Sequence, residues 1–182
     1  MRNSETAQRV VLIITFFLMI HATLIQAEGS VSLDRACLDG KVTVDVSGLG
    51  GSTGDTIVIA VQRKAKESLR ITLVPGTMFE SASAKIQNMA GARIKGERVG
   101  TNSYRPSSEI LLSDDKKHSY IIEAYCMDFD KANPGTADSF SVTAPDPLAG
   151  RIISMGEEMN ASSSVIQSAI WIERAGPTSE TL

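Results

Sequence analysis

Residues 41–47 read Lys-Val-Thr-Val-Asp-Val-Ser, and this alternation of apolar and polar side chains decides the fold class. Successive side chains of a strand point to opposite faces, so the three valines share one face of an extended chain. The stretch therefore predicts a half-buried strand. Extended patterns recur at 56–61, 69–73 and 119–127, with weaker candidates at 78–79, 92–94, 110–112 and 139–142.

The segments between these strands have the composition of turns. Examples are the glycine-rich stretch 48–55, Pro75-Gly76, 114–117 and 133–135. Glycine, proline, asparagine and aspartate favour the backbone conformations of tight turns. Short strands joined by such turns, with no helices between them, predict a mainly β protein. We expect an antiparallel β-sandwich over residues 28–145.

The pattern changes to a helical one after Pro147. Apolar residues at helical spacing run from Leu148 to Met159, and a second apolar stripe covers 163–175. Serines precede the second stripe and Gly176-Pro177 follows it, as is typical of helix ends. We expect one or two helices in a segment over 146–176 that packs on the same domain, followed by a disordered tail over 177–182.

The first 27 residues have the features of an export signal. An apolar run at 10–20 follows two arginines, and the small residue Ala27 ends the segment. A short apolar run that ends at a small residue is typical of a cleaved signal peptide, whereas a membrane span needs about 20 apolar residues. We expect a secreted or cell-surface protein with no membrane segment after cleavage. An uncleaved amino-terminal anchor is the alternative.

Composition argues against several classes of function. The net charge is −3, which is unlike the basic surface of a nucleic-acid-binding protein. The chain has two histidines, and only His118 lies beyond the leader, which disfavours a histidine-rich metal site or a Ser/His/Asp hydrolase. We expect no catalytic residues, no metal and no cofactor, and we predict that the protein is not an enzyme.

The two cysteines, Cys37 and Cys126, are the candidate reactive groups. Two cysteines in an exported chain most often form one disulfide. Cys37 precedes the first clear strand and Cys126 ends a late one, so a bridge between them is our first expectation. Free buried thiols and a more reactive thiol remain as alternatives.

Two short motifs give the reactive alternative a specific form. Tyr125-Cys126-Met127 ends a predicted strand, and Gln167-Ser168-Ala169-Ile170-Trp171 lies on the predicted helix. Together they resemble the paired motifs of the thioester domains in surface adhesins of Gram-positive bacteria. The resemblance implies that Cys126 supplies a thiol and Gln167 an acyl group, and that the two join with loss of ammonia. Tyr125 and Trp171 would then be supporting residues.

Two functions follow from this sequence. The first is a secreted, non-enzymatic binding or structural module that presents loops to a protein or surface ligand, which the sequence does not identify. The second is a surface-attachment module whose Cys126–Gln167 thioester acylates a nucleophile on its partner. A disulfide and a thioester exclude one another at Cys126.

Overall fold

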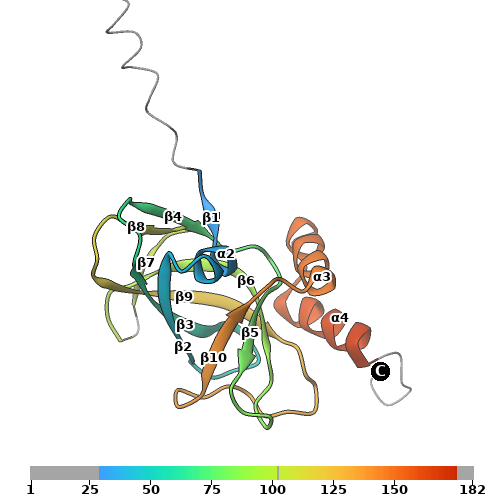
Figure 1. Ribbon diagram of the computed structural model, residues 1–182. Coiled ribbons are helices and arrows are strands. Elements are labelled where there is room, and N and C mark those ends of the chain that lie inside the picture. Colours follow the sequence, from blue (N-terminus) through green and yellow to red (C-terminus); the bar gives the residue numbers. More distant parts are fainter. Residues whose placement is uncertain (1–28, 102, 176–182) are drawn as a thin grey trace, which may run out of the picture.

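The computed structural model describes residues 29–101 and 103–175, and its centre is a closed antiparallel β-barrel (Figure 1). Six strands follow one another around the barrel in the order β5-β10-β2-β3-β9-β6, and β5 also pairs with β6. That last pairing closes the sheet on itself. The strands are β2 (Val42–Gly48), β3 (Thr53–Arg63), β5 (Thr77–Ser81), β6 (Met89–Arg98), β9 (Lys117–Cys126) and β10 (Ser139–Thr143).

The predicted β-sandwich is therefore wrong, and the short strand β5 is the reason. Phe79 of β5 is opposite Met89 of β6 on one side and Val142 of β10 on the other. Gly91 of β6 has no side chain, and a Cβ there would lie 2.9 Å from the Phe79 ring. A glycine at this point lets β6 and β5 approach closely enough to join the two edges of the sheet.

A separate three-stranded sheet lies beside the barrel, and it contains β1 (Val31–Ser32), β4 (Leu69–Thr72) and β8 (Ile110–Leu112). The short strand β7 (Tyr104–Pro106) extends the barrel sheet beyond β6. Helix α2 (Leu33–Leu38) follows β1 and buries Leu33 and Ala36 against the barrel core. The sequence patterns did not predict β1, β7 or α2.

Strand β9 is buried on both faces from Tyr120 to Cys126. Alternate residues of β9, including Ile122 and Cys126, belong to the core inside the barrel. Tyr125, which faces the other way, belongs to a second apolar cluster together with residues of the C-terminal helices. A strand with a core on each side positions its side chains rigidly, because both faces are close-packed.

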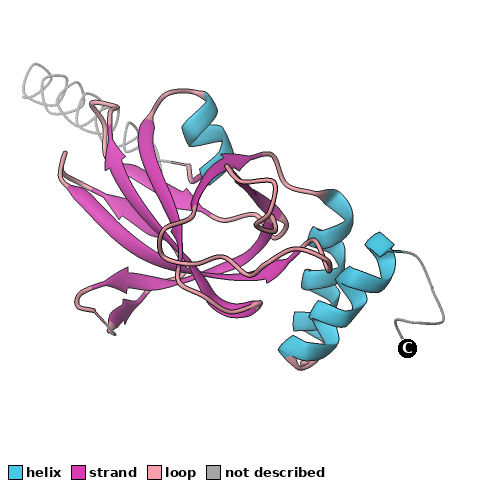
Figure 2. Cartoon of the chain, turned by 90° about the horizontal axis from the view of Figure 1, so that it is seen from below, coloured by secondary structure: helices cyan, strands magenta, loops and turns pink. Residues whose placement is uncertain are grey.

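The second cluster lies under a pair of helices, α3 (Pro147–Glu158) and α4 (Ser163–Ala175), which pack side by side against the outside of the barrel (Figure 2). The prediction of a helix over 163–175 is confirmed by α4. Asp146 caps α3 by accepting hydrogen bonds from the backbone N–H groups of Leu148 and Ala149. Gly150 allows α3 to approach the turn before β5, since a Cβ there would lie 2.5 Å from the Pro75 carbonyl oxygen.

The predicted signal peptide over 1–27 and the predicted tail over 177–182 lie outside the described residues. Within 29–101 and 103–175, the structure contains no helix that is long and apolar enough to cross a membrane.

Candidate functional site

Cys126 is the last residue of β9, at one end of the barrel, where two loops meet. The backbone N–H of the next residue, Met127, donates to the Asn88 carbonyl oxygen at 2.9 Å. The Asn88 N–H in turn donates to the Asp128 carboxylate at 2.9 Å. These bonds join the segment before β6 to the loop after β9. The backbone on both sides of the cysteine is thereby fixed.

Gln167 of α4 is bound to the backbone of Cys126 through both of its polar atoms. Its Oε1 accepts from the Cys126 N–H at 2.8 Å, and its Nε2 donates to the Cys126 carbonyl oxygen at 2.7 Å. The Gln167 side chain is buried, with 3% of its surface exposed. The pairing of β3 with β9 ends at Thr53 opposite Tyr125. The Cys126 N–H also donates to the Ser52 carbonyl oxygen at 3.1 Å, and Cys126 is opposite Met89 of β6. Gln167 therefore shares the Cys126 N–H with the backbone just before β3 and supplies a donor for the Cys126 carbonyl oxygen.

The Cys126 thiol faces a small set of polar and sulfur atoms inside the end of the barrel. Its Sγ lies 3.8 Å from Asn133 Oδ1, to which it donates a hydrogen bond, and 3.7 Å from Met89 Sδ. Burial, together with the charge of Asp128, raises the pKa of the Cys126 thiol to about 12, although a hydrogen bond with the Gln87 side chain opposes the shift. The thiol is therefore protonated at neutral pH and is protected from solvent oxidants.

The predicted disulfide is wrong, since Cys37 and Cys126 are both unbonded thiols. Cys37 lies on α2 just before β2, whose first residue is opposite Arg63 at the end of β3. Cys126 lies beyond Thr53 at the start of β3. The eleven residues of β3 span roughly 30 Å, whereas a disulfide needs Cα atoms within about 7 Å of each other. Burial also raises the pKa of the Cys37 thiol, to about 11.

The two predicted supporting residues lie on either side of Gln167. Tyr125 is buried beneath the helices, and its pKa is raised by that burial, while a hydrogen bond with the Ser163 side chain acts in the opposite direction. Trp171 follows Gln167 by one helical turn, and its ring meets Phe129 edge to face with centroids 5.2 Å apart. Together they hold α4 against β9 and the loop that follows it.

Sequence reasoning missed two residues of this site, Gln87 and Asn133. Gln87 is 1% exposed, and its Nε2 donates to Asn133 Oδ1 at 2.5 Å. Both lie in stretches with turn composition, which usually predicts exposed loops. No local sequence pattern identifies the two residues as part of a site, because the contact joins residues 46 positions apart.

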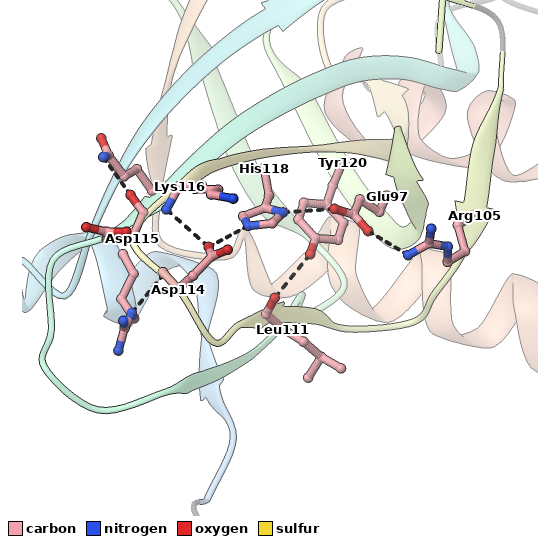
Figure 3. Close-up of polar contacts among 10 residues, drawn as sticks. Glu97, Arg105, Leu111, Asp114, Asp115, Lys116, His118 and Tyr120 are labelled. Atoms are coloured by element: carbon pink, nitrogen blue, oxygen red, sulfur yellow. Dashed lines mark hydrogen bonds and ion pairs between the residues drawn. The ribbon is translucent and has the colours of Figure 1, made fainter. Parts of the chain in front are cut away.

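A second polar cluster surrounds His118 at the opposite end of β9 (Figure 3). His118 Nδ1 lies 2.8 Å from a Glu97 carboxylate oxygen, and His118 Nε2 lies 2.8 Å from an Asp114 carboxylate oxygen. Arg105 pairs with Glu97 at 3.5 Å, and Tyr120 donates to the Leu111 carbonyl oxygen at 3.5 Å. An open cavity lies beside this cluster and is lined in part by Glu97, Arg105, His118 and Tyr120.

The His118 cluster is organised as an ion-pair network. Hydrogen bonds that its ring N–H groups donate to Asp114 and Glu97 raise the pKa of His118, because both carboxylates favour the imidazolium ion. With each ring nitrogen on a carboxylate, the imidazole has no nitrogen left to accept a proton from a substrate. No group of three or more histidine, cysteine, aspartate or glutamate side chains in the described part of the chain is arranged to hold a metal ion.

Comparisons of this chain with protein-family models, with curated proteins and with solved structures found no match. Its function is therefore inferred from the chemistry of its own residues.

Proposed function

We propose that this protein is a non-enzymatic attachment module that acts outside the cell through an internal thioester between Cys126 and Gln167. One observation supports the proposal most directly: the Gln167 carboxamide is bonded to both backbone polar groups of Cys126. A carboxamide held in this way lies beside the Cα of Cys126, and the thiol sulfur is only two bonds further along the side chain. The sulfur itself contacts Asn133 and Met89, so the condensation requires it to leave these contacts and turn toward the amide carbon.

The condensation needs no external reagent. The Cys126 sulfur attacks Cδ of Gln167, a new S–Cδ bond forms, and the Cδ–Nε2 bond breaks. The thiol proton leaves with the nitrogen, so that the products are a thioester and ammonia. The hydrogen bond from the Cys126 N–H to Oε1 polarises the carbonyl and stabilises negative charge that develops on that oxygen.

Burial gives the thioester the protection that it needs. Cys126 has no exposed surface and Gln167 has 3%, so water has little access to the bond. A nucleophile on the partner, once admitted, would displace the Cys126 thiol and become acylated by Gln167. Because the thiol is not regenerated as a thioester, each molecule attaches once, which is binding rather than turnover.

A second candidate is a non-covalent binding module in which Gln167 only fastens α4 to the barrel. The observation that favours it is an exposed aromatic side chain near the site. Phe129 is 61% exposed and, together with Trp171 and Asp130, lines an open pocket. Large exposed aromatic residues are typical of binding surfaces.

Intact mass before and after treatment with methylamine separates the two candidates. The attachment module should be lighter than its sequence by one ammonia, and it should take up one methylamine at Gln167. Cys126→Ala should have its full sequence mass and form no adduct, whereas Cys37→Ala should behave as the wild type. A wild-type protein of full sequence mass that forms no adduct would leave the non-covalent candidate.

A further inference from the structure

We infer that the outer face of the α3–α4 helix pair is a dimer interface, and that its partner is a second copy of this chain. The two helices lie side by side on the outside of the barrel (Figure 2). The face in question is the one that they turn away from the barrel. This inference does not depend on the proposed thioester.

Each of the two helices has an apolar stripe beyond the one that packs on the barrel. The stripes that face the barrel are buried, and they contain Ala149, Gly150, Ile153, Ile166, Gln167 and Ile170. The further stripes are exposed or half-buried, and they contain Leu148, Ile152, Met155 and Met159 on α3 and Val165, Ala169 and Ile172 on α4. Residues at i, i+4 and i+7 share one side of a helix. Both helices are therefore apolar over more of their circumference than the barrel covers.

The two outer stripes adjoin one another. Gly156 lets the helices approach closely, since a Cβ there would lie 2.5 Å from the Ile166 side chain. Ile152 of α3 and Ile170 of α4 line the same small pocket. The short link at 159–162 makes the helices antiparallel. In an antiparallel pair, stripes that are displaced in the same sense from the buried side lie next to each other, so the two form one continuous apolar surface.

This surface is large enough for a weak dimer. Its side chains reach well into solvent, because Met155, Met159 and Val165 are 54%, 76% and 58% exposed. Continuous exposed apolar surface is typical of interaction sites, and methionine adapts its shape to a partner. The face measures roughly 18 Å along the helices and 20 Å across them, at the low end for a specific interface. We therefore expect a reversible dimer.

The order of residues on α3 fits a second α3 that runs in the opposite direction. Its outer stripe is spaced by four, three and four positions, so it reads the same from either end. A two-fold axis across the middle of the stripe therefore pairs apolar residues throughout. Leu148 of one copy meets Met159 of the other, and Ile152 meets Met155.

Charge favours the same orientation. Arg151 and Glu158 are exposed and lie two helical turns apart along one edge of the apolar surface. Neither has an ion-pair partner among residues 29–101 and 103–175. In the antiparallel arrangement, Arg151 of each copy approaches Glu158 of the other, whereas a parallel arrangement would place like charges together. The edge of the face is thus complementary to itself.

Sedimentation velocity over a range of concentrations tests the dimer, with protein purified after expression of the full chain. The wild type should change from monomer to dimer as the concentration rises. Met155→Lys places a charge in the middle of the face and should weaken the dimer at least about tenfold. Leu111→Lys is the matched control, because Leu111 is equally exposed, at 53%, but lies on β8. It should leave the dimer unchanged.

Charge reversal at the edge tests the orientation of the two copies. Arg151→Glu places carboxylates against each other at two points of the dimer and should weaken it about fivefold or more at low salt. Adding Glu158→Arg exchanges the two charges and should restore most of the affinity. Both side chains are exposed, so the double variant remains informative if Met155→Lys fails to fold. Thermal unfolding shows whether each variant has folded.

Three results would overturn the inference. The first is a wild type that stays monomeric at every concentration, as expected if a lipid, another protein or a terminal segment of the same chain covers the face. The second is a dimer that a folded Met155→Lys leaves intact, because it would use another surface. The third is a dimer that Arg151→Glu weakens and the double variant does not restore, which would contradict the antiparallel pairing.

Discussion

The two ends of β9 hold two polar clusters of opposite character. At its first residues, His118 is surrounded by charged groups that are partly exposed, and the exposed fractions of the His118, Glu97 and Asp114 side chains are 25%, 27% and 41%. At its last residue, Cys126 is fully buried and contacts the buried sulfur of Met89 and the amide of Asn133, which reaches the surface. One strand thus connects an open ionic cluster to a mostly buried cluster of sulfur and amide groups, with the charge of Asp128 nearby.

The difference shows how solvent determines the energy of a polar contact. In the His118 cluster, water screens every charge, so each ion pair contributes little to the free energy of folding. Between Cys126 and the Gln167 carboxamide, water is excluded, so an unmade hydrogen bond carries its full desolvation cost. The number of polar contacts at each end is therefore a poor guide to stability or function. The degree to which those contacts are buried is a better guide to stability or function.

The largest expected effect is at the closed end. In a Cys126→Ala background, where Gln167 keeps its carboxamide, Gln167→Leu removes both of its hydrogen bonds to the backbone of residue 126 and takes the donor from the carbonyl oxygen there, so the free energy of unfolding should fall by about 2–4 kcal/mol. The matched control is Gln62→Leu, because Gln62 donates to the Asp115 carbonyl oxygen at 2.8 Å near the open end. It should change stability by less than about 0.5 kcal/mol. Urea unfolding of both variants measures the contrast, and equal losses would remove the distinction between the two ends.

An intermediate effect is expected in the middle of β9. Glu123 is 6% exposed and pairs with Arg93 at 2.7 Å and with Lys95 at 3.4 Å. Glu123→Gln keeps the volume but loses the charge, and stability should fall by about 1–2 kcal/mol, since both cations can still turn to water. Glu109→Gln, which breaks an exposed pair with Arg70, is the control and should have an effect near zero. A Glu109→Gln loss as large as that of Glu123→Gln would show that burial is not the deciding factor.

The smallest effect is expected at the open end, and it should depend on pH. The folded protein raises the pKa of His118 above 6.5, so protonation of His118 stabilises the fold. This contribution is complete below pH 6.5 and is lost as the pH rises through the raised pKa. The stability difference between wild type and His118→Gln should therefore shrink as the pH rises above 6.5. The lowered pKa of Asp114 acts only at lower pH. Chemical unfolding at several pH values tests this, and a difference that grows with pH would contradict it.

The strands of the barrel could be predicted from sequence, and the closure of the barrel could not. Alternation in 41–47 and in 119–127 predicted strands that the structure contains as β2 and β9. Alternation records which residues face a core, and it is the same in a sandwich and in a barrel. Closure requires the five residues of β5 to pair with β10 on one side and with β6 on the other. No local sequence pattern specifies these two partners. Helix α2, with six residues, is too short to show a helical period.

The candidate site was accessible from sequence only in part. The two-motif resemblance paired Cys126 with Gln167, and the structure brings their side chain and backbone together. The distance between Cys37 and Cys126 could not be predicted, because it depends on which end of β3 each cysteine adjoins. Gln87 and Asn133 were missed for a similar reason, because a hydrogen bond between the amides of two loops depends on tertiary contacts alone.

The single tryptophan of the chain gives this protein an optical property of its own. Trp171 lies on the helix that carries Gln167, and its indole meets Phe129 of the loop after β9 at 5.2 Å. Its ultraviolet emission therefore originates from one place, the contact between that helix and that loop. Separation of the two elements would move the indole into water and shift its emission to longer wavelength. The native chain thus carries a dye-free optical probe within one helical turn of its candidate reactive group.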